Sequence, residues 1–401
     1  MLSLEAALDR VVSGITPLPG ERVPLHTAAG RWLAQEVISP RDLPAFDNSA
    51  MDGYAVQSAA LAQASLEKPF QLSLRGETPA GHAPGELLVA GECRRIFTGA
   101  PLPPGADAVV MQEDTRMDPA APGVVFVLDA VRPWDHVRFR GEDVKMGMSL
   151  ARAGDRLNFA MIALLGAVGI REVSATRRPK VALLATGSEL VEPGGELVPG
   201  QIFESNRSMI EALARETGCE TVVLPIVADD LPATRAAIAE AFAVGDVVIT
   251  TGGVSVGAHD FVKEAFEALG GDLAFWKVAI RPGKPFAWGR LQGRHFFGLP
   301  GNPVSAAVTF LLLVRPALIR LQGGNDGGLP TALGTLTTTL RNPGERRHFV
   351  RVKMDRGGQV TPVGQQGSHI LSGLVAAQGL VDVPPGAVWE SGRPVEVLRF
   401  P

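Results

Sequence analysis

The chain has 401 residues, of which 46% are hydrophobic and 20% are charged, and its formal net charge is −4. That length exceeds one ordinary hydrophobic core, so we expect a soluble protein of two to four domains. The weak negative charge and the 6% aromatic content argue against a nucleic-acid-binding surface, which requires basic patches and stacking side chains.

The N-terminal part of the chain, residues 1–176, combines helical and β-like patterns. Apolar residues recur with helical spacing at Leu4, Leu8 and Val11, so the first residues predict an amphipathic helix and not a signal peptide. We expect helical segments within 1–45 and 141–176. They flank a β-rich subdomain at 46–140, where Pro and Gly separate short apolar runs.

Strand-like and helix-like segments alternate in the middle of the chain, residues 177–325. The apolar runs 181–185, 222–227 and 247–250 are each followed by a helical pattern, and a long helix is predicted over 303–321. This alternation predicts an α/β domain with a doubly wound, mostly parallel sheet.

A Gly-rich segment at 323–330 introduces the last part of the chain, residues 326–401. Its short β-like pieces have no helical period, so we expect an all-β, barrel-like C-terminal domain. The predicted fold class is therefore a multi-domain α/β protein with an N-terminal helical and β-rich region.

Cysteine usage and apolar run length indicate the compartment. Cys93 and Cys219 are too few for a disulfide framework or a zinc site, so we expect reduced thiols in a cytoplasmic protein. The longest apolar stretches, 159–170 and 304–314, fall short of the roughly 18–20 residues that a membrane span needs.

Acidic residues follow three of the predicted parallel strands, at Glu189, Asp229 and Asp260. The carboxyl ends of parallel strands meet at one edge of a sheet, where ligands bind, so these carboxylates are expected to converge there. Oxygen ligands without a His or Cys cluster favour Mg²⁺. Each acid taken alone is better explained as a helix cap or a solvated loop residue, but the three together favour a ligand site.

Glycines and hydroxyls accompany these acids. A strand that ends in such residues and leads into a helix presents backbone N–H groups to an anion such as phosphate. The residues expected to bind that anion are Thr186, Gly187, Ser188, Gly252, Gly253 and Ser255.

Cations follow at Lys277, Arg281 and Lys284, around a Pro-Gly turn. They suit a phosphate or another tetrahedral oxyanion, although a solvated basic turn is an equally simple explanation. A rigid turn then opens the long predicted helix, with Asn302 as its N-cap and Pro303 in its first turn. Together with Pro300, this turn is a second candidate seat for an anion.

A series of long motifs extends over nearly the whole chain. They are MDGYA (51–55), FTGAPLPPGADAVVMQE (97–113), VRFRGED (137–143), ATGSELVEPG (185–194), TTGGVSVGAHDF (250–261), KVAIRPGKP (277–285), FGLPGNPVS (297–305) and QGSHILSGL (366–374). In content and order they resemble the molybdopterin molybdenumtransferases, the MoeA/gephyrin E-domain family of molybdenum-cofactor assembly. The resemblance implies a homodimer of elongated subunits that converts adenylated molybdopterin and molybdate, with Mg²⁺, into molybdenum cofactor and AMP.

The resemblance also implies roles for individual residues. Glu189, Asp229 and Asp260 would be the carboxylates of the active-site cleft and its metal ligands, with the cations Lys277 and Arg281 beside them. The remaining implied contacts are Lys284 and Ser255 near molybdate; Asp52, Thr98, Arg138 and Asp143 from the other subunit; and Arg351 with either Ser368 or Ser372 near the oxyanion.

Two other functions remain open on the sequence. The sibling activity, adenylation of molybdopterin, uses the same kind of α/β domain but often without additional N-terminal and C-terminal domains. A carrier or scaffold that binds the cofactor without turnover is the other alternative. The adenylating enzyme is a possible partner in either case.

Overall fold

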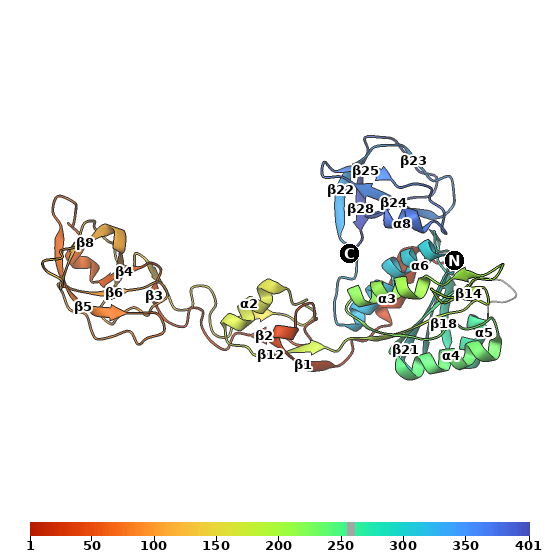
Figure 1. The fold of residues 1–401 in the computed structure, drawn as a ribbon, viewed down its shortest axis with the longest axis horizontal. Coiled ribbons are helices and arrows are strands. Elements are labelled where there is room, and N and C mark those ends of the chain that lie inside the picture. Colours follow the sequence, from red (N-terminus) through yellow and green to blue (C-terminus); the bar gives the residue numbers. More distant parts are fainter. Residues whose placement is uncertain (255–260) are drawn as a thin grey trace.

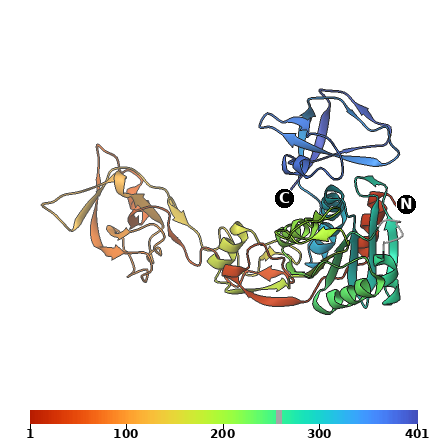
Figure 2. The same ribbon diagram turned by 45° about the vertical axis from the view of Figure 1, so that its right-hand side comes forward.

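The computed structural model describes residues 1–254 and 261–401. The molecule is elongated (Figure 1): a β-rich lobe lies at one end, and an α/β unit with a β unit stacked above it lies at the other. Figure 2 shows the same separation of the β-rich lobe from a second direction. A small connecting unit that contains α2 (Phe159–Ala167) lies between the two ends.

The α/β unit is built on a six-stranded sheet, which confirms the predicted doubly wound, mostly parallel arrangement. The strands, in spatial order, are β16 (Glu220–Val223), β13 (Lys180–Ala185), β17 (Val247–Thr251), β21 (Arg294–Leu299), β20 (Pro285–Leu291) and β18 (Asp272–Lys277). The first four run parallel, and β20 is antiparallel to both of its neighbours.

Alternate residues of the central strands pack against helices on opposite faces of this sheet. Val247 and Ile249 share a core with α1 (Leu4–Ser13), α3 (Asn206–Glu216) and the helical stretch after β21. The neighbouring Val248 instead packs on the other face, with α4 (Leu231–Val244) and α5 (Val262–Ala268). Because side chains alternate along a strand, a strand covered on both faces is apolar throughout.

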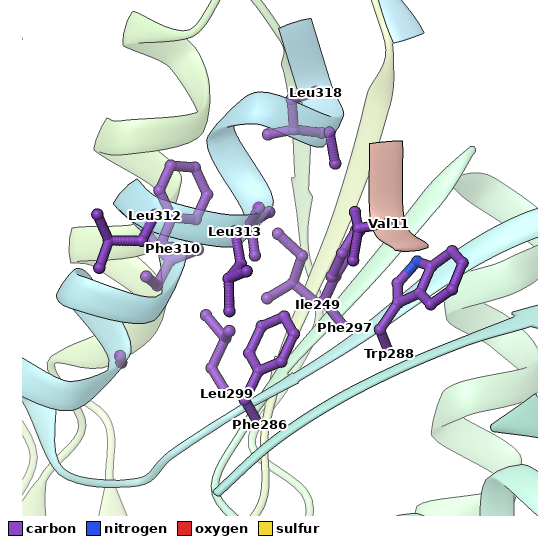
Figure 3. Packing of buried hydrophobic residues seen from close by; sticks show 14 of the residues in the cluster. Val11, Ile249, Phe286, Trp288, Phe297, Leu299, Phe310, Leu312, Leu313 and Leu318 are labelled. Atoms are coloured by element: carbon purple, nitrogen blue, oxygen red, sulfur yellow. The ribbon is translucent and has the colours of Figure 1, made fainter. Parts of the chain in front are cut away.

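The long helix predicted over 303–321 is present as α6 (Pro303–Thr309), a π-helical segment (Phe310–Val314) and α7 (Arg315–Leu321). Pro316 has no N–H to donate to the carbonyl of Leu312, and the wider π turn accommodates its ring. By length and composition this stretch could cross a membrane, but 83% of it is buried within the protein. Figure 3 shows Phe310, Leu313 and Leu318 packed over Phe297 and Ile249, as expected for a core helix.

The expected helical character of residues 1–45 and 141–176 is wrong for most of their length. Only α1 and α2 are α-helices there, because prolines such as Pro17 and Pro19 break the first helix. The other elements are the antiparallel pairs β1 (Gly20–Pro24) with β12 (Glu172–Thr176) and β2 (Val37–Ile38) with β11 (Ser149–Ala151), and a 3₁₀ turn at Leu25–Thr27.

The first helix, α1, packs against the α/β unit, although it precedes the rest of the N-terminal region in the sequence. Ala7 and Val11 of α1 are fully buried in the core of the α/β unit and not in the N-terminal region. A helical apolar stripe predicts that one face is buried but does not say against which partner. We keep the boundaries after residues 176 and 325 as a proposal, with α1 assigned to the α/β unit.

The β-rich lobe contains a six-stranded sheet, and the C-terminal β unit contributes five strands to another sheet. The lobe has the order β7 (Ala108–Met111), β4 (Gly53–Val56), β6 (Glu92–Ile96), β5 (Phe70–Thr78), β9 (Val124–Val127) and β8 (Thr115–Met117). Beside it, β3 (Asn48–Ser49) pairs with β10 (Val137–Arg138), and short 3₁₀ turns lie at Ser58–Leu61 and Gln112–Asp114.

The C-terminal unit closes into a barrel, as predicted. Its strands are β24 (Arg347–Met354), β25 (Gln359–Pro362), β22 (Thr331–Leu336), β28 (Pro394–Arg399) and β26 (Gly379–Val383), which pairs back with β24. The short pair β23 (Leu340–Arg341) with β27 (Val388–Trp389) and the helix α8 (Leu371–Val375) complete it. The α/β unit adds β19 (Ile280–Arg281) to the edge of β24, so the two units share a sheet.

Both cysteines are free and buried. Burial, the largest influence on each, raises the pKa of Cys93 and of Cys219 to about 12, so neither thiol is a reactive nucleophile in the folded chain.

Phe297→Ala should destabilise the α/β unit by about 3–5 kcal/mol, because it removes a fully buried ring from beneath the core helix. The measurement is urea unfolding followed by Trp fluorescence. Phe159→Ala is the matched control: that ring is 87% exposed, and its loss should change stability by less than about 0.5 kcal/mol. Equal effects of the two substitutions would contradict this description of the core.

Candidate active site

A cleft of about 640 Å³ lies at the carboxyl ends of β13, β17 and β21. The α/β unit provides most of its lining, and a loop of the C-terminal barrel provides the rest through His369 and Leu371. This is the edge at which open parallel sheets bind ligands. The residues on the sheet side that were predicted from the sequence and line the cleft are Thr186, Gly187, Glu189, Asp229, Gly252, Gly253, Pro300, Asn302 and Pro303.

Two of the three predicted acids lie in this cleft. Asp229 is fixed by reciprocal hydrogen bonds: its Oδ2 accepts from the Ser188 N–H at 3.0 Å, and its own N–H donates to the Ser188 hydroxyl at 3.0 Å. Glu189 lies one residue beyond Ser188 and is exposed to the cleft. Asp260 and Ser255, also predicted here, lie outside the described residues.

The turn after β17 requires glycine. Gly252 and Gly253 have φ angles of +86° and +65°, which residues with a Cβ atom rarely adopt. A Cβ atom on Gly252 would also lie 2.5 Å from the Thr186 carbonyl oxygen. The two glycines therefore allow the end of β17 to approach the end of β13, and their backbone lines the cleft.

Three buried polar atoms from cleft-lining residues have no hydrogen-bond partner among the described residues. They are the hydroxyls of Thr186 and Thr251 and the Oδ1 atom of Asn206. Asn206 is held in place by its other amide atom, since Nδ2 donates to the Gly301 carbonyl at 2.6 Å. A buried polar group without a partner costs roughly 1–3 kcal/mol, so such a cluster is expected where a ligand completes the hydrogen bonds.

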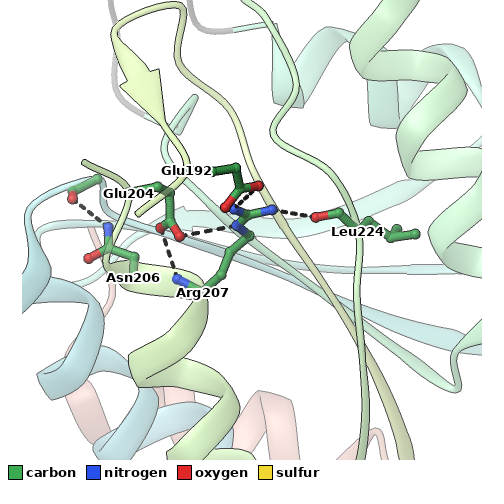
Figure 4. Close-up of polar contacts among 6 residues, drawn as sticks. Glu192, Glu204, Asn206, Arg207 and Leu224 are labelled. Carbon is green, nitrogen blue, oxygen red and sulfur yellow. Dashed lines mark hydrogen bonds and ion pairs between the residues drawn. The ribbon is translucent and has the colours of Figure 1, made fainter. Parts of the chain in front are cut away.

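Asn206 was not among the residues predicted from the sequence. It is the first residue of α3, and an Asn at the start of a helix usually serves the helix terminus and does not contact a ligand. Its neighbour Arg207 organises the same wall of the cleft (Figure 4). The Arg207 guanidinium is ion-paired with Glu204 at 3.1 Å and with Glu192 at 2.7 Å, and it donates to the Leu224 carbonyl.

This network is almost fully buried at its centre, with side-chain exposures of 5% for Arg207 and 3% for Glu204. Burial works to lower the pKa of Arg207, but the two carboxylates outweigh it and leave that pKa raised. Glu204 lines the cleft but is occupied by this ion pair. The network holds the segment that carries β14 (Leu190–Val191) and β15 (Ile202–Phe203), which form an apolar lip beside the cleft.

The predicted cations do not join the acids. Within the described part of the chain, the lining of the cleft does not include Lys277, Arg281 or Lys284, although Pro285 borders it. For Arg281 the reason is the strand pairing, because β19 pairs with β24 and aligns Arg281 with His348 of the barrel, whereas Lys277 ends β18 in the α/β sheet opposite Pro285. Arg281 and the Pro-Gly turn that follows it therefore lie where the α/β unit contacts the barrel.

The turn before α6 behaves as predicted. Asn302 is the N-cap residue, Pro303 occupies the first turn, and both line the cleft with Pro300. The Asn302 side chain is exposed and makes no capping hydrogen bond, so it is available to a ligand.

Arg351 differs from the expectation of an anion contact. Its side chain is buried, and its guanidinium donates to the carbonyls of Ile370, Gln365 and Gly367 at 2.7, 2.7 and 3.0 Å. Burial lowers the pKa of Arg351. Ser368 contributes its backbone carbonyl to the N–H of Val304, and the described lining includes neither Ser368 nor Ser372.

The remaining predicted residues lie far from this cleft. Asp52, Thr98, Arg138 and Asp143 belong to the β-rich lobe and its connection, at the opposite end of the molecule. Asp52 accepts hydrogen bonds from the Thr98 N–H and then from the Thr98 hydroxyl, at 2.8 and 2.9 Å, and these lower the pKa of Asp52. Within one chain these residues do not contribute to the cleft.

The donor set of the cleft is compatible with magnesium. Among residues 1–254 and 261–401, no three His, Cys, Asp or Glu side chains lie close enough together to hold a metal ion. Mg²⁺, however, is often held by one or two carboxylates and completed by substrate phosphates and water. Glu189 and Asp229, which have no ion-pair partner among the described residues, fit that description.

Comparison with known proteins identifies the family. The chain matches the models of the MoeA N-terminal region (domain I and II) over residues 2–169, of a probable molybdopterin binding domain over 182–320, and of the MoeA C-terminal region (domain IV) over 334–400. It is 40% identical to the molybdopterin molybdenumtransferase of Haemophilus influenzae, covering 94% of this chain and 92% of that protein. It is also 40% identical to molybdopterin molybdenumtransferase 2 of Mycobacterium tuberculosis, covering 91% of each.

Solved structures agree. A MoeA protein of Pyrococcus horikoshii superposes with a TM-score of 0.84 at 35% identity and covers 100% of this chain and 99% of its own. The chain belongs to the MoeA family of molybdopterin molybdenumtransferases, enzymes of molybdenum-cofactor biosynthesis.

Gly252→Ala should destabilise the protein more than Gly270→Ala does. Both glycines have positive φ, so both substitutions incur a left-handed backbone cost of about 1–2 kcal/mol. Only the Cβ at 252 meets a backbone atom, whereas nothing lies within 4 Å of a Cβ at 270. Thermal unfolding of the two variants measures the difference, and equal losses would contradict the close approach of the two strand ends.

Proposed function

We propose that this protein inserts molybdenum from molybdate into adenylated molybdopterin in the cytoplasm, with Mg²⁺-dependent release of AMP. The observation that carries the proposal is the composition of the cleft. Two acids without ion-pair partners among the described residues, Glu189 and Asp229, lie beside a glycine turn and buried hydroxyls. Handling a phosphoanhydride calls for these groups: carboxylates to hold the metal, and amide and hydroxyl donors for the phosphate oxygens.

The residues have separate tasks in this proposal. Asp229 and Glu189 hold Mg²⁺ with the predicted ligand Asp260, and the bound ion neutralises the negative charge of the phosphates. The Gly253 N–H and the hydroxyl of Thr186 receive phosphate oxygens, and Gly252 lines the same turn with its own N–H donating to the Leu299 carbonyl at 3.2 Å. The exposed Asn302 side chain, beside the first turn of α6, forms a second seat for an oxyanion, whereas the Val304 N–H already donates to the Ser368 carbonyl.

Molybdate is a tetrahedral dianion, so cations and hydroxyl donors suit it. Lys284, Arg281, Lys277 and Ser255 retain this role as part of the proposal. The segment 277–284, which carries the three cations, leads directly into Pro285 at the border of the cleft, and Arg281 and Lys284 are exposed. The pterin dithiolene supplies the sulfur ligands, which is consistent with two cysteines that are both buried.

The adenylating activity and the non-catalytic carrier are less well supported. The family models extend over the N-terminal region and the C-terminal barrel, neither of which an adenylating domain needs. A pure carrier gives no reason to gather acids in a cleft where a phosphate must bind, because like charges there disfavour binding.

We also propose a homodimer in which each cleft is completed by the β-rich lobe of the other copy. Asp52, Thr98, Arg138 and Asp143 are then contributed by the second subunit. The elongated shape supports this arrangement, because it places the lobe far from the cleft of its own chain. A handover of the adenylated substrate from the adenylating enzyme is a further part of this proposal.

Asp229→Asn should reduce molybdate-dependent AMP release about 100-fold or more, since it removes a metal-binding charge and keeps the shape. The matched control is Asp230→Asn. That neighbouring side chain caps α4 by accepting from the Ala233 N–H at 2.8 Å, which asparagine also does. AMP release is followed by chromatography. A similar loss in both variants, or in neither, would refute the assignment of Asp229.

Co-expression of an Asp52→Ala chain with an Asp229→Asn chain tests the shared site. Each variant alone should be nearly inactive. Random pairing should restore about a quarter of wild-type activity, since half of the dimers then contain one intact site of two. No recovery in an isolated heterodimer would contradict the contribution of the second subunit.

A further inference from the structure

Acidic residues predominate among the titratable side chains that line the described part of the cleft. Its titratable lining residues are the acids Glu189, Glu204 and Asp229 and a single residue that can carry positive charge, His369. An anionic ligand that enters this cleft therefore meets carboxylates on the side of the α/β unit. The one basic side chain among the described lining residues comes from the C-terminal barrel.

Arg351 holds the loop that carries His369 through hydrogen bonds. Besides its three bonds to loop carbonyls, Arg351 is tied to the loop through Gln366: the Arg351 N–H donates to Gln366 Oε1 at 2.9 Å, and Gln366 Nε2 donates back to the Arg351 carbonyl at 3.1 Å. All of these partners lie within residues 365–370. Because the guanidinium is planar and its donors have a fixed geometry, these hydrogen bonds restrict the conformation of the loop.

The same loop is fixed from the side by the α/β unit. The Val304 N–H, in the first turn of α6, donates to the Ser368 carbonyl at 3.0 Å, and α8 packs against α6. His369 is therefore placed between an anchor in the barrel and an anchor at the edge of the cleft. The His369 side chain itself is exposed.

A buried, charged Arg351 is costly unless its donors are used, and here the donors are used on backbone carbonyls of one loop. A loop of solvated residues needs no such support. The cost of burying Arg351 is explained when the loop must hold a residue at a fixed position. The residues of this loop that line the cleft are His369 and Leu371.

We infer that His369 is a ligand-contacting residue whose imidazole N–H donates to an oxygen of the bound anion, and that Arg351 is the positioning residue for it. This inference rests on the proposed function, since it assumes a tetrahedral oxyanion in the cleft. The chemistry recognised is a phosphate or molybdate oxygen, and the experiment separates these two sources.

The first test is His369→Ala, with kcat and the separate KM values for adenylated molybdopterin and for molybdate measured by AMP release. Loss of a hydrogen bond to a charged oxygen should raise one of the two KM values about tenfold. A rise for adenylated molybdopterin indicates the phosphate, and a rise for molybdate indicates that oxyanion. His369→Gln, which keeps an N–H donor, should recover most of the loss.

The control is Val375→Ala, on the neighbouring helix α8, where the side chain is 87% exposed and outside the cleft lining. It should leave all three parameters unchanged. Wild-type protein without molybdate-dependent AMP release would refute the proposed function. An active wild type with both KM values of His369→Ala within twofold of it would overturn this inference alone.

The second test concerns the positioning role and uses Arg351→Lys, which keeps the charge but not the planar guanidinium. It should raise the same KM value as His369→Ala and increase proteolytic cleavage within residues 363–376. The double variant should then be no worse than His369→Ala alone. Fully additive losses, with no added cleavage, would show that Arg351 acts independently of His369 and would overturn the positioning role.

Discussion

The close approach of the ends of β13 and β17 is the constraint on which the site depends. Both strands are buried on both faces by helices, so their direction and register are fixed by core packing. Where they end, Gly252 approaches the Thr186 carbonyl more closely than any side chain would allow. Backbone amides, buried hydroxyls and the Ser188–Asp229 hydrogen bonds are consequently gathered over a short stretch of the sheet edge.

The C-terminal barrel complements this edge and does not merely follow it in the chain. It receives β19 from the α/β unit, which moves the cations at Arg281 and Lys284 to the joint between the two units. It also returns one loop to the cleft, held by Arg351 and by the first turn of α6. The acids of the site therefore belong to the α/β unit, and the basic side chains at and around it depend on how the barrel is seated.

Sequence patterns predicted the features that are local. The apolar runs at 181–185 and 247–250, the helix over 303–321, the Gly252-Gly253 turn and the all-β character of residues 326–401 depend on periodicity or turn chemistry, which neighbouring residues determine. The predicted strand 222–227 is wrong in its bounds: β16 spans Glu220–Val223 and ends before Pro225, which cannot donate to the ladder. Val227 forms an isolated bridge with Thr186.

Features that depend on distant partners could not be predicted in the same way. The stripe on α1 does not reveal that it packs in the α/β core, and Arg351 looks like an anion ligand until its carbonyl partners are known. Asn206 and His369 were missed because a helix-start Asn and a lone loop His carry no pattern of their own. The signal that identifies Asn206 is a buried oxygen without a partner, and for His369 it is the absence of other basic residues in the described lining.

A crystal structure of the protein with AMP and molybdate would show directly where the cleft binds phosphate. We expect the AMP phosphate at the strand ends, within hydrogen-bonding distance of the Gly252 and Gly253 turn or the Thr186 hydroxyl and beside Asp229. A phosphate bound elsewhere, with the Thr186 and Thr251 hydroxyls still without partners, would contradict this expectation.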